Sequence, residues 1–379
     1  MTRPGEGERG VRLLITADAA GGVWTYALDL AAGLSAHGVI PVLAVLGQPP
    51  RGDQLVRAAA IPGLELHLTG LPLDWMADGP REMLAAGQAL AALATEARVD
   101  AVHLNSPAHA AGTTFPVPVV AVTHSCVPTW WHAVRGDALP AEYAWQAELT
   151  RRGCLAAATL GAPSHAFAEA TAALYALPAL PRVVHNGRRR MAAPGEPPPG
   201  LPALFVLTAG RLWDKGKNLE ALDRAAARLA IPVLAAGPLE GPNGDRAEPR
   251  HLRPLGSLGE PALAALLARR PIYASLALYE PFGLAVLEAA QAGCPLVLSD
   301  IPTFRELWGA AALYAPPDDD GAAVAAIAGL AEDPAARARL GAAARRRAAR
   351  YTPEAMAAAM LALYRPLLRP GLPAGSVAA

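Results

Sequence analysis

The chain has 379 residues, which is enough for two domains of ordinary size. Its 33 basic and 33 acidic side chains cancel, so net charge gives no reason to expect nucleic acid or an anionic surface as a partner. Alanine inflates the hydrophobic fraction of 53%, and no apolar run reaches the roughly 18 residues that would indicate a transmembrane helix.

The polar N-terminus and the cysteines indicate the cellular setting. Residues 1–10 lack the apolar centre of a signal peptide. Cys126, Cys154 and Cys294 lack metal-ligand spacing. We therefore expect a cytoplasmic protein with reduced, buried thiols.

Short apolar runs alternate with alanine- and leucine-rich helical runs along the whole chain. This alternation predicts repeated β-α units and parallel sheets. In the first half, strands are expected at 11–15, 41–46, 64–68, 101–104, 117–122, 158–162 and 182–184.

A proline-rich break from Met191 to Pro202 cannot hold a helix and predicts a linker. The pattern then restarts. Strands are expected there at 204–208, 232–236, 272–274, 296–298 and 312–314.

The chain is therefore predicted to be an α/β protein of two facing Rossmann-like domains, residues 1–188 and 203–355, with a linker at 189–202 and a cleft between them. Ligands of such sheets bind at the carboxyl ends of the strands. Thr352-Pro353-Glu354 marks the start of a last helical stretch that reaches 368. The tail after Pro370 is expected to be disordered.

The segment from Tyr279 to Glu288 is the most informative part of the chain. Glu280 and Glu288 flank a Pro-Phe-Gly turn between an apolar run, 271–276, and a helical run. A helix that begins just after Gly283 would direct free backbone N–H groups at a ligand above the strand, which suits a diphosphate. The two carboxylates could reach opposite ends of one elongated ligand.

This segment resembles the E-x7-E motif of the family 4 retaining glycosyltransferases, which have the GT-B fold. The resemblance implies that Glu280 faces the hydroxyls of the donor sugar and that Glu288 binds the ribose. It assigns the sugar and diphosphate to the backbone of Phe282, Gly283 and Leu284. It further implies that a C-terminal helix, within residues 356–379, crosses back onto the first domain.

The start of the second domain, Gly210-Arg211-Leu212, is similar to the family's G-R-L…K element, whose Arg and Lys neutralise the donor diphosphate. Here Arg211 is the arginine, and the commonest spacing for the lysine falls on Gly216, between Lys215 and Lys217. We favour Lys217. The segment also imitates a phosphate-binding P-loop, but five residues separate the glycines where four are required, and Asn218 stands where Ser or Thr is needed.

In the first domain, the resemblance places the loop containing Gly22 near the donor phosphates or the acceptor. It also places His124, which follows an expected strand, opposite the reacting sugar. A lone histidine is, however, more often structural. Adjacent Trp130 and Trp131, in an expected loop, could form an acceptor platform or simply anchor the loop.

Three further features of the second half are a glycine, a run of aspartates and a group of arginines. Gly237 resembles part of a loop around the donor nucleotide. Asp318-Asp319-Asp320 is better explained by helix capping than by a metal site. The arginines between 337 and 350 indicate a solvated helix face, although peripheral membrane contact remains an alternative.

The resemblance implies transfer of a hexose-type sugar from a UDP- or GDP-sugar to an acceptor hydroxyl, with retention and without metal or other cofactor. Arg211 and Lys217 would stabilise the leaving diphosphate in a front-face reaction. The acceptor (saccharide, lipid-linked or small molecule) is not specified. The alternatives are a nucleotide-sugar 2-epimerase on the same fold and a non-catalytic nucleotide-sugar-binding protein.

Overall fold

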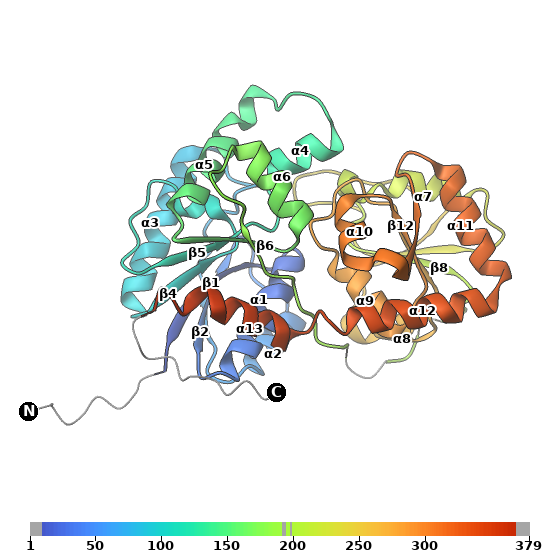
Figure 1. Ribbon diagram of the computed structural model, residues 1–379, viewed down its shortest axis with the longest axis horizontal. Coiled ribbons are helices and arrows are strands. Elements are labelled where there is room, and N and C mark those ends of the chain that lie inside the picture. Colours follow the sequence, from blue (N-terminus) through green and yellow to red (C-terminus); the bar gives the residue numbers. More distant parts are fainter. Residues whose placement is uncertain (1–9, 192–194, 198, 369–379) are drawn as a thin grey trace, which may run out of the picture.

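Two parallel sheets lie at the centres of two lobes, which stand side by side in Figure 1. The computed structural model describes residues 10–191, 195–197 and 199–368. Within them, the first sheet has the order β3-β2-β1-β4-β5-β6-β7, and every pairing is parallel. Its strands are β1 (Arg12–Asp18), β2 (Ile40–Leu46), β3 (Glu65–Leu68), β4 (Ala101–Leu104), β5 (Val119–Val122), β6 (Thr159–Ala162) and β7 (Arg182–Val183).

The second sheet has the order β10-β9-β8-β11-β12-β13, again parallel. Its strands are β8 (Val206–Ala209), β9 (Val233–Ala236), β10 (Arg253–Gly256), β11 (Ile272–Ser275), β12 (Leu296–Ser299) and β13 (Ala312–Ala315). The two Rossmann-like α/β halves expected from the sequence are confirmed.

Strand β10 is not among the strands expected from the sequence. The strand lies at the edge of its sheet, contains Pro254 and is largely exposed. It therefore lacks the apolar run that marks a central parallel strand, and proline is tolerated because an edge strand leaves one side unpaired.

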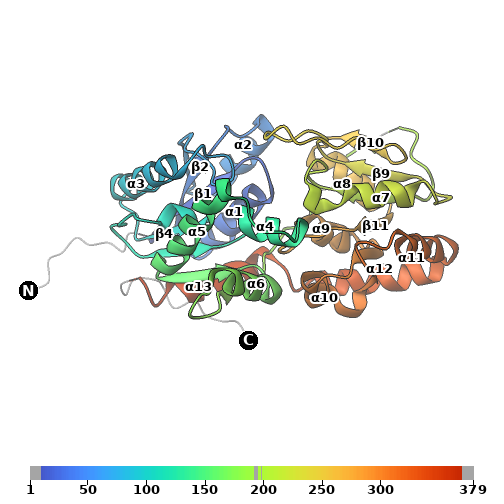
Figure 2. The same ribbon diagram turned by 90° about the horizontal axis from the view of Figure 1, so that it is seen from above.

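Helices cover both faces of each sheet (Figures 1 and 2). In β1, Leu13 and Ile15 pack into a core cluster that contains α1, whereas Leu14 packs into the cluster on the opposite face. This alternation follows from the two-residue period of a strand. The first lobe contains α1 (Gly22–Ser35), α2 (Gly52–Ala59), α3 (Pro80–Glu96), α4 (Val127–Val134), α5 (Ala144–Ala156) and α6 (His165–Tyr175).

The second lobe is built in the same way, with separate core clusters on the two faces of its sheet. Its helices are α7 (Leu219–Ala226), α8 (Glu260–Ala268), α9 (Leu284–Ala292), α10 (Pro302–Trp308), α11 (Asp320–Glu332) and α12 (Pro334–Ala348).

The last helix, α13 (Pro353–Tyr364), returns to the first lobe and lies against α1 (Figure 1). Thr352 caps it by accepting a hydrogen bond from the Ala355 N–H at 3.2 Å. Met356, Met360 and Tyr364 are buried in the α1 core cluster. The helix therefore begins where expected and returns to the first lobe, but it ends at Tyr364 rather than at residue 368.

The two chain crossings between the lobes touch each other. A Cβ added at Gly187 would lie 2.0 Å from the Thr352 carbonyl oxygen, so only glycine fits there. Beside it, the Arg188 N–H donates to the Tyr351 carbonyl at 3.1 Å. The described residues of the expected linker contain no helix or strand. Residues 192–194 and 198, like 1–9 and 369–379, lie outside the described residues.

Two smaller expectations, on the cysteines and on the aspartate run, are confirmed. Cys126, Cys154 and Cys294 are free and buried. Asp319 caps α11 by accepting from the Ala322 N–H at 2.9 Å, as expected of the aspartate run. No helix in the described part of the chain is long and apolar enough to cross a membrane.

The arginine-rich helix, α12, is not solvated along its whole length. Arg337 donates to the carbonyl oxygens of Leu330 and Ala331, and Arg347 donates to those of Glu306 and Leu307. These two side chains satisfy carbonyl groups at the ends of α11 and α10, so the expectation of a purely solvated face was wrong for them.

Candidate active site between the lobes

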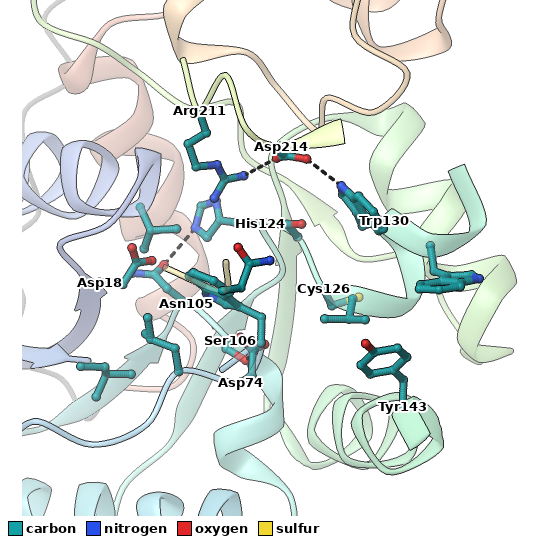
Figure 3. A pocket seen from close by; sticks show the side chains of 18 of the residues that line it. Asp18, Asp74, Asn105, Ser106, His124, Cys126, Trp130, Tyr143, Arg211 and Asp214 are labelled. Carbon is teal, nitrogen blue, oxygen red and sulfur yellow. Dashed lines mark hydrogen bonds and ion pairs between the residues drawn. The ribbon is translucent and has the colours of Figure 1, made fainter. Parts of the chain in front are cut away.

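A cavity of about 460 Å³ lies between the lobes, at the carboxyl ends of the first sheet's central strands. Asp18 ends β1, Asn105 directly follows β4, and His124 stands two residues after β5. All three line the cavity together with Arg211 and Asp214 of the second lobe (Figure 3). Because parallel strands end at the same edge, polar residues distant in sequence meet there.

Asp214 joins the two lobes at this cavity. Its carboxylate accepts hydrogen bonds from the Trp130 indole N–H at 2.9 Å and from the Arg211 guanidinium at 3.1 Å (Figure 3). It also accepts from the Gly216 N–H at 2.9 Å. Asp214 is only 7% exposed, so it holds Arg211 in a defined orientation beside the first lobe.

Trp130 and Trp131 lie in helix α4, and the prediction that they occupy a loop was wrong. Pro128 stands in the first turn of that helix, where its missing N–H costs nothing. The Thr129 hydroxyl bonds the Cys126 backbone at the helix start. Both indole rings line the cavity. The Trp130 N–H serves the contact with Asp214, so Trp130 is both a wall of the cavity and an anchor between lobes.

Lys217 and Glu280 form an ion pair, with 2.5 Å between Nζ and Oε2. Both side chains are largely buried, whereas Lys215 is exposed. The structure thus brings Lys217, and not Lys215, to Glu280. Neither member of the pair lines the 460 Å³ cavity.

Asn218 explains how Lys217 is held. It adopts the left-handed conformation, with φ of 54°, which asparagine tolerates better than most residues. Its amide nitrogen donates to the carbonyls of Leu276 and Pro317, both at 2.9 Å. Asn218 therefore ties the loop to the neighbouring strand ends, where a P-loop would need a metal-binding hydroxyl.

Helix α9 begins after Gly283, as predicted, and Gly283 has φ of 90°. Leu284, its first residue, faces the first lobe. A Cβ added at Gly22 would lie 3.4 Å from Leu284 Cδ1, and one added at Gly21 would lie 3.4 Å from Arg211 Nη1. The glycine loop that starts α1 thus meets the start of α9 and Arg211 across the cleft.

Gly237 and Phe282 have structural explanations of their own. A Cβ at Gly237 would stand 1.8 Å from the Gly210 carbonyl oxygen, so the close approach of two loops requires glycine there. The Phe282 ring is 3% exposed and packs edge-on against Tyr351, with 5.5 Å between ring centroids. Their donor-binding roles remain predictions.

Glu288 is paired with Arg188, which comes from the chain crossing between the lobes. The Arg188 Nε lies 2.7 Å from Glu288 Oε1, and its Nη1 lies 3.2 Å from Asp29 Oδ2. Burial raises the pKa of Glu288, and the Arg188 guanidinium opposes that rise. Arg57 pairs with the other Asp29 oxygen at 2.5 Å. Glu288 therefore lies within a buried ionic network, and its binding of ribose remains a prediction.

Two segments of the second lobe, at Pro281 and at Glu306, contact the start of helix α6 of the first lobe. Glu306 accepts from the His165 and Ala166 N–H groups, at 2.9 and 2.8 Å, and so caps α6. The Ser164 hydroxyl donates to the Pro281 carbonyl at 2.8 Å, next to Glu280. The lobes are therefore in direct contact around the E-x7-E segment.

No three His, Cys, Asp or Glu side chains of the described residues are grouped so that they could hold a metal ion. The cleft brings together cations, carboxylates and helix N-termini, which suit a phosphate-bearing ligand.

Sequence reasoning missed Asn105, Asp18 and Asp214 as members of the site. The side-chain oxygen of Asn105, Oδ1, lies 2.9 Å from the ring nitrogen Nε2 of His124. The signal was present for the first two, because each stands at the carboxyl end of a strand, as His124 does. Asp214 carried no such signal, because its partner Trp130 is 84 residues away.

Two protein-family models match the chain, and the boundary between their matches coincides with the boundary between the two sheets. The model described as Glycosyltransferase Family 4 matches residues 20–189, and the model described as Glycosyl transferases group 1 matches residues 202–347. The chain belongs to the GT-B glycosyltransferases of the family 4 type.

Individual relatives match parts of the chain. A glycogen synthase of Mycobacterium tuberculosis is 41% identical over 100 residues, which are 26% of this chain and 24% of the relative. A phosphatidyl-myo-inositol mannosyltransferase of Mycolicibacterium smegmatis is 31% identical over 186 residues, 45% of this chain and 46% of the relative. The matches therefore span less than half of each relative's length.

Solved structures match the whole fold at low sequence identity. Sucrose-phosphate synthase from Thermosynechococcus elongatus aligns with a TM-score of 0.73 and 20% identity, covering 94% of this chain and 99% of that one. Anabaena HepE in complex with UDP-glucose aligns with a TM-score of 0.70 and 17% identity, covering 94% and 100%. These likenesses establish the GT-B architecture.

Proposed function

We propose that this protein transfers a hexose-type sugar from a nucleotide diphosphate sugar to an acceptor hydroxyl, with retention of anomeric configuration and without a metal ion. The observation that carries this proposal is the grouping of Arg211 and the Lys217–Glu280 pair with two helix N-termini, those of α1 and α9.

This grouping supports a diphosphate site. Free N–H groups at a helix N-terminus attract anions, and the glycine loop at the start of α1 lies against both Arg211 and the first residue of α9. Arg211 offers a planar fork of donors, and Lys217 offers a compact charge. In the proposed reaction both cations stabilise the negative charge that grows on the leaving diphosphate.

The bond changes balance without a further reactant. The bond between sugar C1 and the diphosphate oxygen breaks, and the acceptor oxygen bonds to C1 from the same face. The acceptor proton passes to the leaving diphosphate oxygen. In this scheme Glu280 orients the sugar hydroxyls, and its ion pair with Lys217 holds the carboxylate in place.

For the donor we propose a UDP- or GDP-sugar, since Anabaena HepE, a structural neighbour, is a complex with UDP-glucose. We propose that the acceptor binds in the part of the cavity that Trp130 and Trp131 line. Aromatic faces stack well on the apolar faces of sugars and of other ring compounds.

A donor panel tests the proposal. UDP-, GDP- and ADP-sugars are added in the presence of a chelator, and thermal stabilisation and release of nucleoside diphosphate are measured. We expect stabilisation by one base class together with slow release of the nucleoside diphosphate as water takes the sugar. Once an acceptor is added, the glycoside formed should have the donor's anomeric configuration in proton NMR.

A matched variant completes the test. Glu280→Gln keeps the size of the side chain but removes the charge that pairs with Lys217. We expect at least a tenfold loss of turnover with donor-induced stabilisation retained. Turnover at the wild-type rate would refute the assigned site, and no response to any donor would refute the proposed function.

A further inference from the structure

A buried chain of hydrogen bonds connects the last helix to His124. The Tyr364 hydroxyl lies 2.6 Å from His103 Nδ1. The other ring nitrogen of His103, Nε2, lies 3.0 Å from Asn105 Oδ1. The same Asn105 oxygen lies 2.9 Å from His124 Nε2. Tyr364, His103 and Asn105 are 2%, 0% and 8% exposed, so water does not compete for these contacts.

The orientation of the Asn105 amide is decided by its neighbour Thr16. The amide nitrogen of Asn105 donates to the Thr16 carbonyl, and the Asn105 backbone N–H donates to the Thr16 hydroxyl at 2.8 Å. A carbonyl oxygen can only accept, so the amide nitrogen must face it. The amide oxygen therefore faces both histidine rings.

This orientation determines the tautomers of the two histidines. The Asn105 oxygen only accepts, so both rings carry their proton on Nε2. The Tyr26 hydroxyl lies farther from His103 Nε2, at 3.4 Å, and acts there as a second acceptor. Burial lowers the pKa of His103 to about 4 and that of His124 to about 3, so both rings are neutral near pH 7. His103 then accepts from the Tyr364 hydroxyl through Nδ1, and His124 keeps Nδ1 as its one acceptor atom.

The His124 ring is also held in place by packing. Tyr26 of α1 meets it edge-on, with 4.3 Å between ring centroids and 64° between the planes. The ring lines the cavity on the side of Arg211 (Figure 3). A ring held by Asn105 and by Tyr26 keeps one orientation at the cavity.

We propose that Asn105, His103 and Tyr364 are positioning residues that fix His124 as its Nε2–H tautomer. His124 then meets a substrate hydroxyl as a hydrogen-bond acceptor through Nδ1, and does not act as an acid or a base. Because Tyr364 lies on α13, docking of that helix becomes part of assembling the site. Only the identity of the hydroxyl rests on the proposed function, since the tautomer belongs to the unliganded protein.

The first experiment is nitrogen-15 NMR of the unliganded full chain labelled at histidine. The spectra of His124→Gln and His103→Gln identify the two signals by their loss. We expect both rings to show the pattern of a neutral imidazole protonated at Nε2, and Asn105→Ala to introduce the Nδ1–H form at His124. A wild-type His124 protonated at Nδ1 would overturn the proposal.

The second experiment removes one hydroxyl at a distance from the cavity. Tyr364→Phe keeps the ring in the α13 core but removes the donor to His103. Tyr314→Phe is the matched control, because its hydroxyl donates to the carbonyls of Phe304 and Gly309 in the second lobe. Both variants are assayed for donor turnover well below their unfolding temperature.

We expect Tyr364→Phe to lower kcat about fivefold, the rate equivalent of roughly one hydrogen bond, with the donor KM changed less than about twofold. Tyr314→Phe is expected to retain wild-type kcat at a similar loss of thermal stability. Equal kcat in the two variants would overturn the role of Tyr364. Absence of turnover in the wild type would refute the proposed function, while the NMR result would still decide the tautomer.

Discussion

At the scale of single residues, the site consists of charges that hold one another in place. Arg211 is oriented by Asp214, which also bonds Trp130 of the other lobe. Lys217 is oriented by Glu280. A cation that is already positioned loses little entropy when it binds a phosphate, which favours catalysis over mere attraction.

The two lysines near Gly216 provide a direct test. Lys217→Ala removes the cation paired with Glu280, and we expect kcat for donor turnover to fall by about 10²- to 10³-fold. Lys215→Ala removes an exposed charge one position before Gly216, and we expect a change below about threefold. Similar losses in the two variants would contradict the choice of Lys217.

The buried His103 predicts a dependence of stability on pH. Burial holds its pKa at about 4, below the ordinary value of 6.5. Between these values the unfolded chain binds a proton that the folded chain does not, so stability falls as pH falls from about 6.5 to about 4. This group contributes at most about 3 kcal/mol to that fall.

Denaturant unfolding at a series of pH values, compared between wild type and His103→Gln, measures the effect. We expect the wild type to lose more stability than the variant over this interval, because glutamine does not titrate. If stability depended on pH in the same way in both proteins, His103 would not have a lowered pKa in the folded state. Carboxylates titrate in both proteins, so they cancel in the comparison.

At the scale of elements, helix α13 and the two chain crossings beside it hold the lobes together. The helix buries Met356, Met360 and Tyr364 in the first lobe, although it follows the second lobe in sequence. The crossings touch at Gly187 and Thr352, and no side chain fits at Gly187. Close backbone contact at a crossing limits the relative motion of the lobes.

Gly187→Ala is expected to force these crossings apart, because the added Cβ would lie 2.0 Å from the Thr352 carbonyl oxygen. We expect a loss of about 1–3 kcal/mol in the free energy of unfolding. Gly52→Ala is the matched control, since a Cβ there meets nothing within 4 Å. Its effect should stay within about 0.5 kcal/mol in denaturant unfolding. Equal effects would show that the crossings separate without cost.

At the scale of the whole molecule, a buried ionic network spans the two lobes. Arg188 contacts Asp29 of the first lobe and Glu288 and Glu260 of the second. It is 3% exposed, so its charge depends on these partners. The network places the second glutamate of the E-x7-E motif in the contact between lobes.

Arg188→Met removes the shared cation and leaves Glu288 without its partner in a buried site. We expect a loss of about 3 kcal/mol, the lower end of the effect of breaking a buried pair, because Asp29 keeps Arg57. Arg346→Met, at an exposed position of α12, is the control and should change stability little. Thermal and denaturant unfolding measure both, and equal midpoints would contradict a stabilising role for the network.

The sequence alone was sufficient for the two α/β halves and for the start of helix α9. Strands buried on both faces must be apolar, and glycine, proline and capping residues mark where helices begin. Strands and helix starts can therefore be recognised from a few neighbouring residues. The start of α9 could therefore be predicted from a short stretch, whereas the roles of Glu280, Arg211 and Lys217 are implied by the family resemblance and stay predictions. The edge strand β10 could not be predicted, because half-exposed strands need no apolar run.

Only the tertiary structure decided which of these groups meet. Asp214 with Trp130, Arg188 with Glu288, and Tyr364 with His103 are pairs separated by 84, 100 and 261 residues. No local pattern specifies such partners, because a hydrogen bond or ion pair depends on distance in space. The helix that contains the two tryptophans and the tautomer of His124 likewise follow from contacts, which sequence spacing does not reveal.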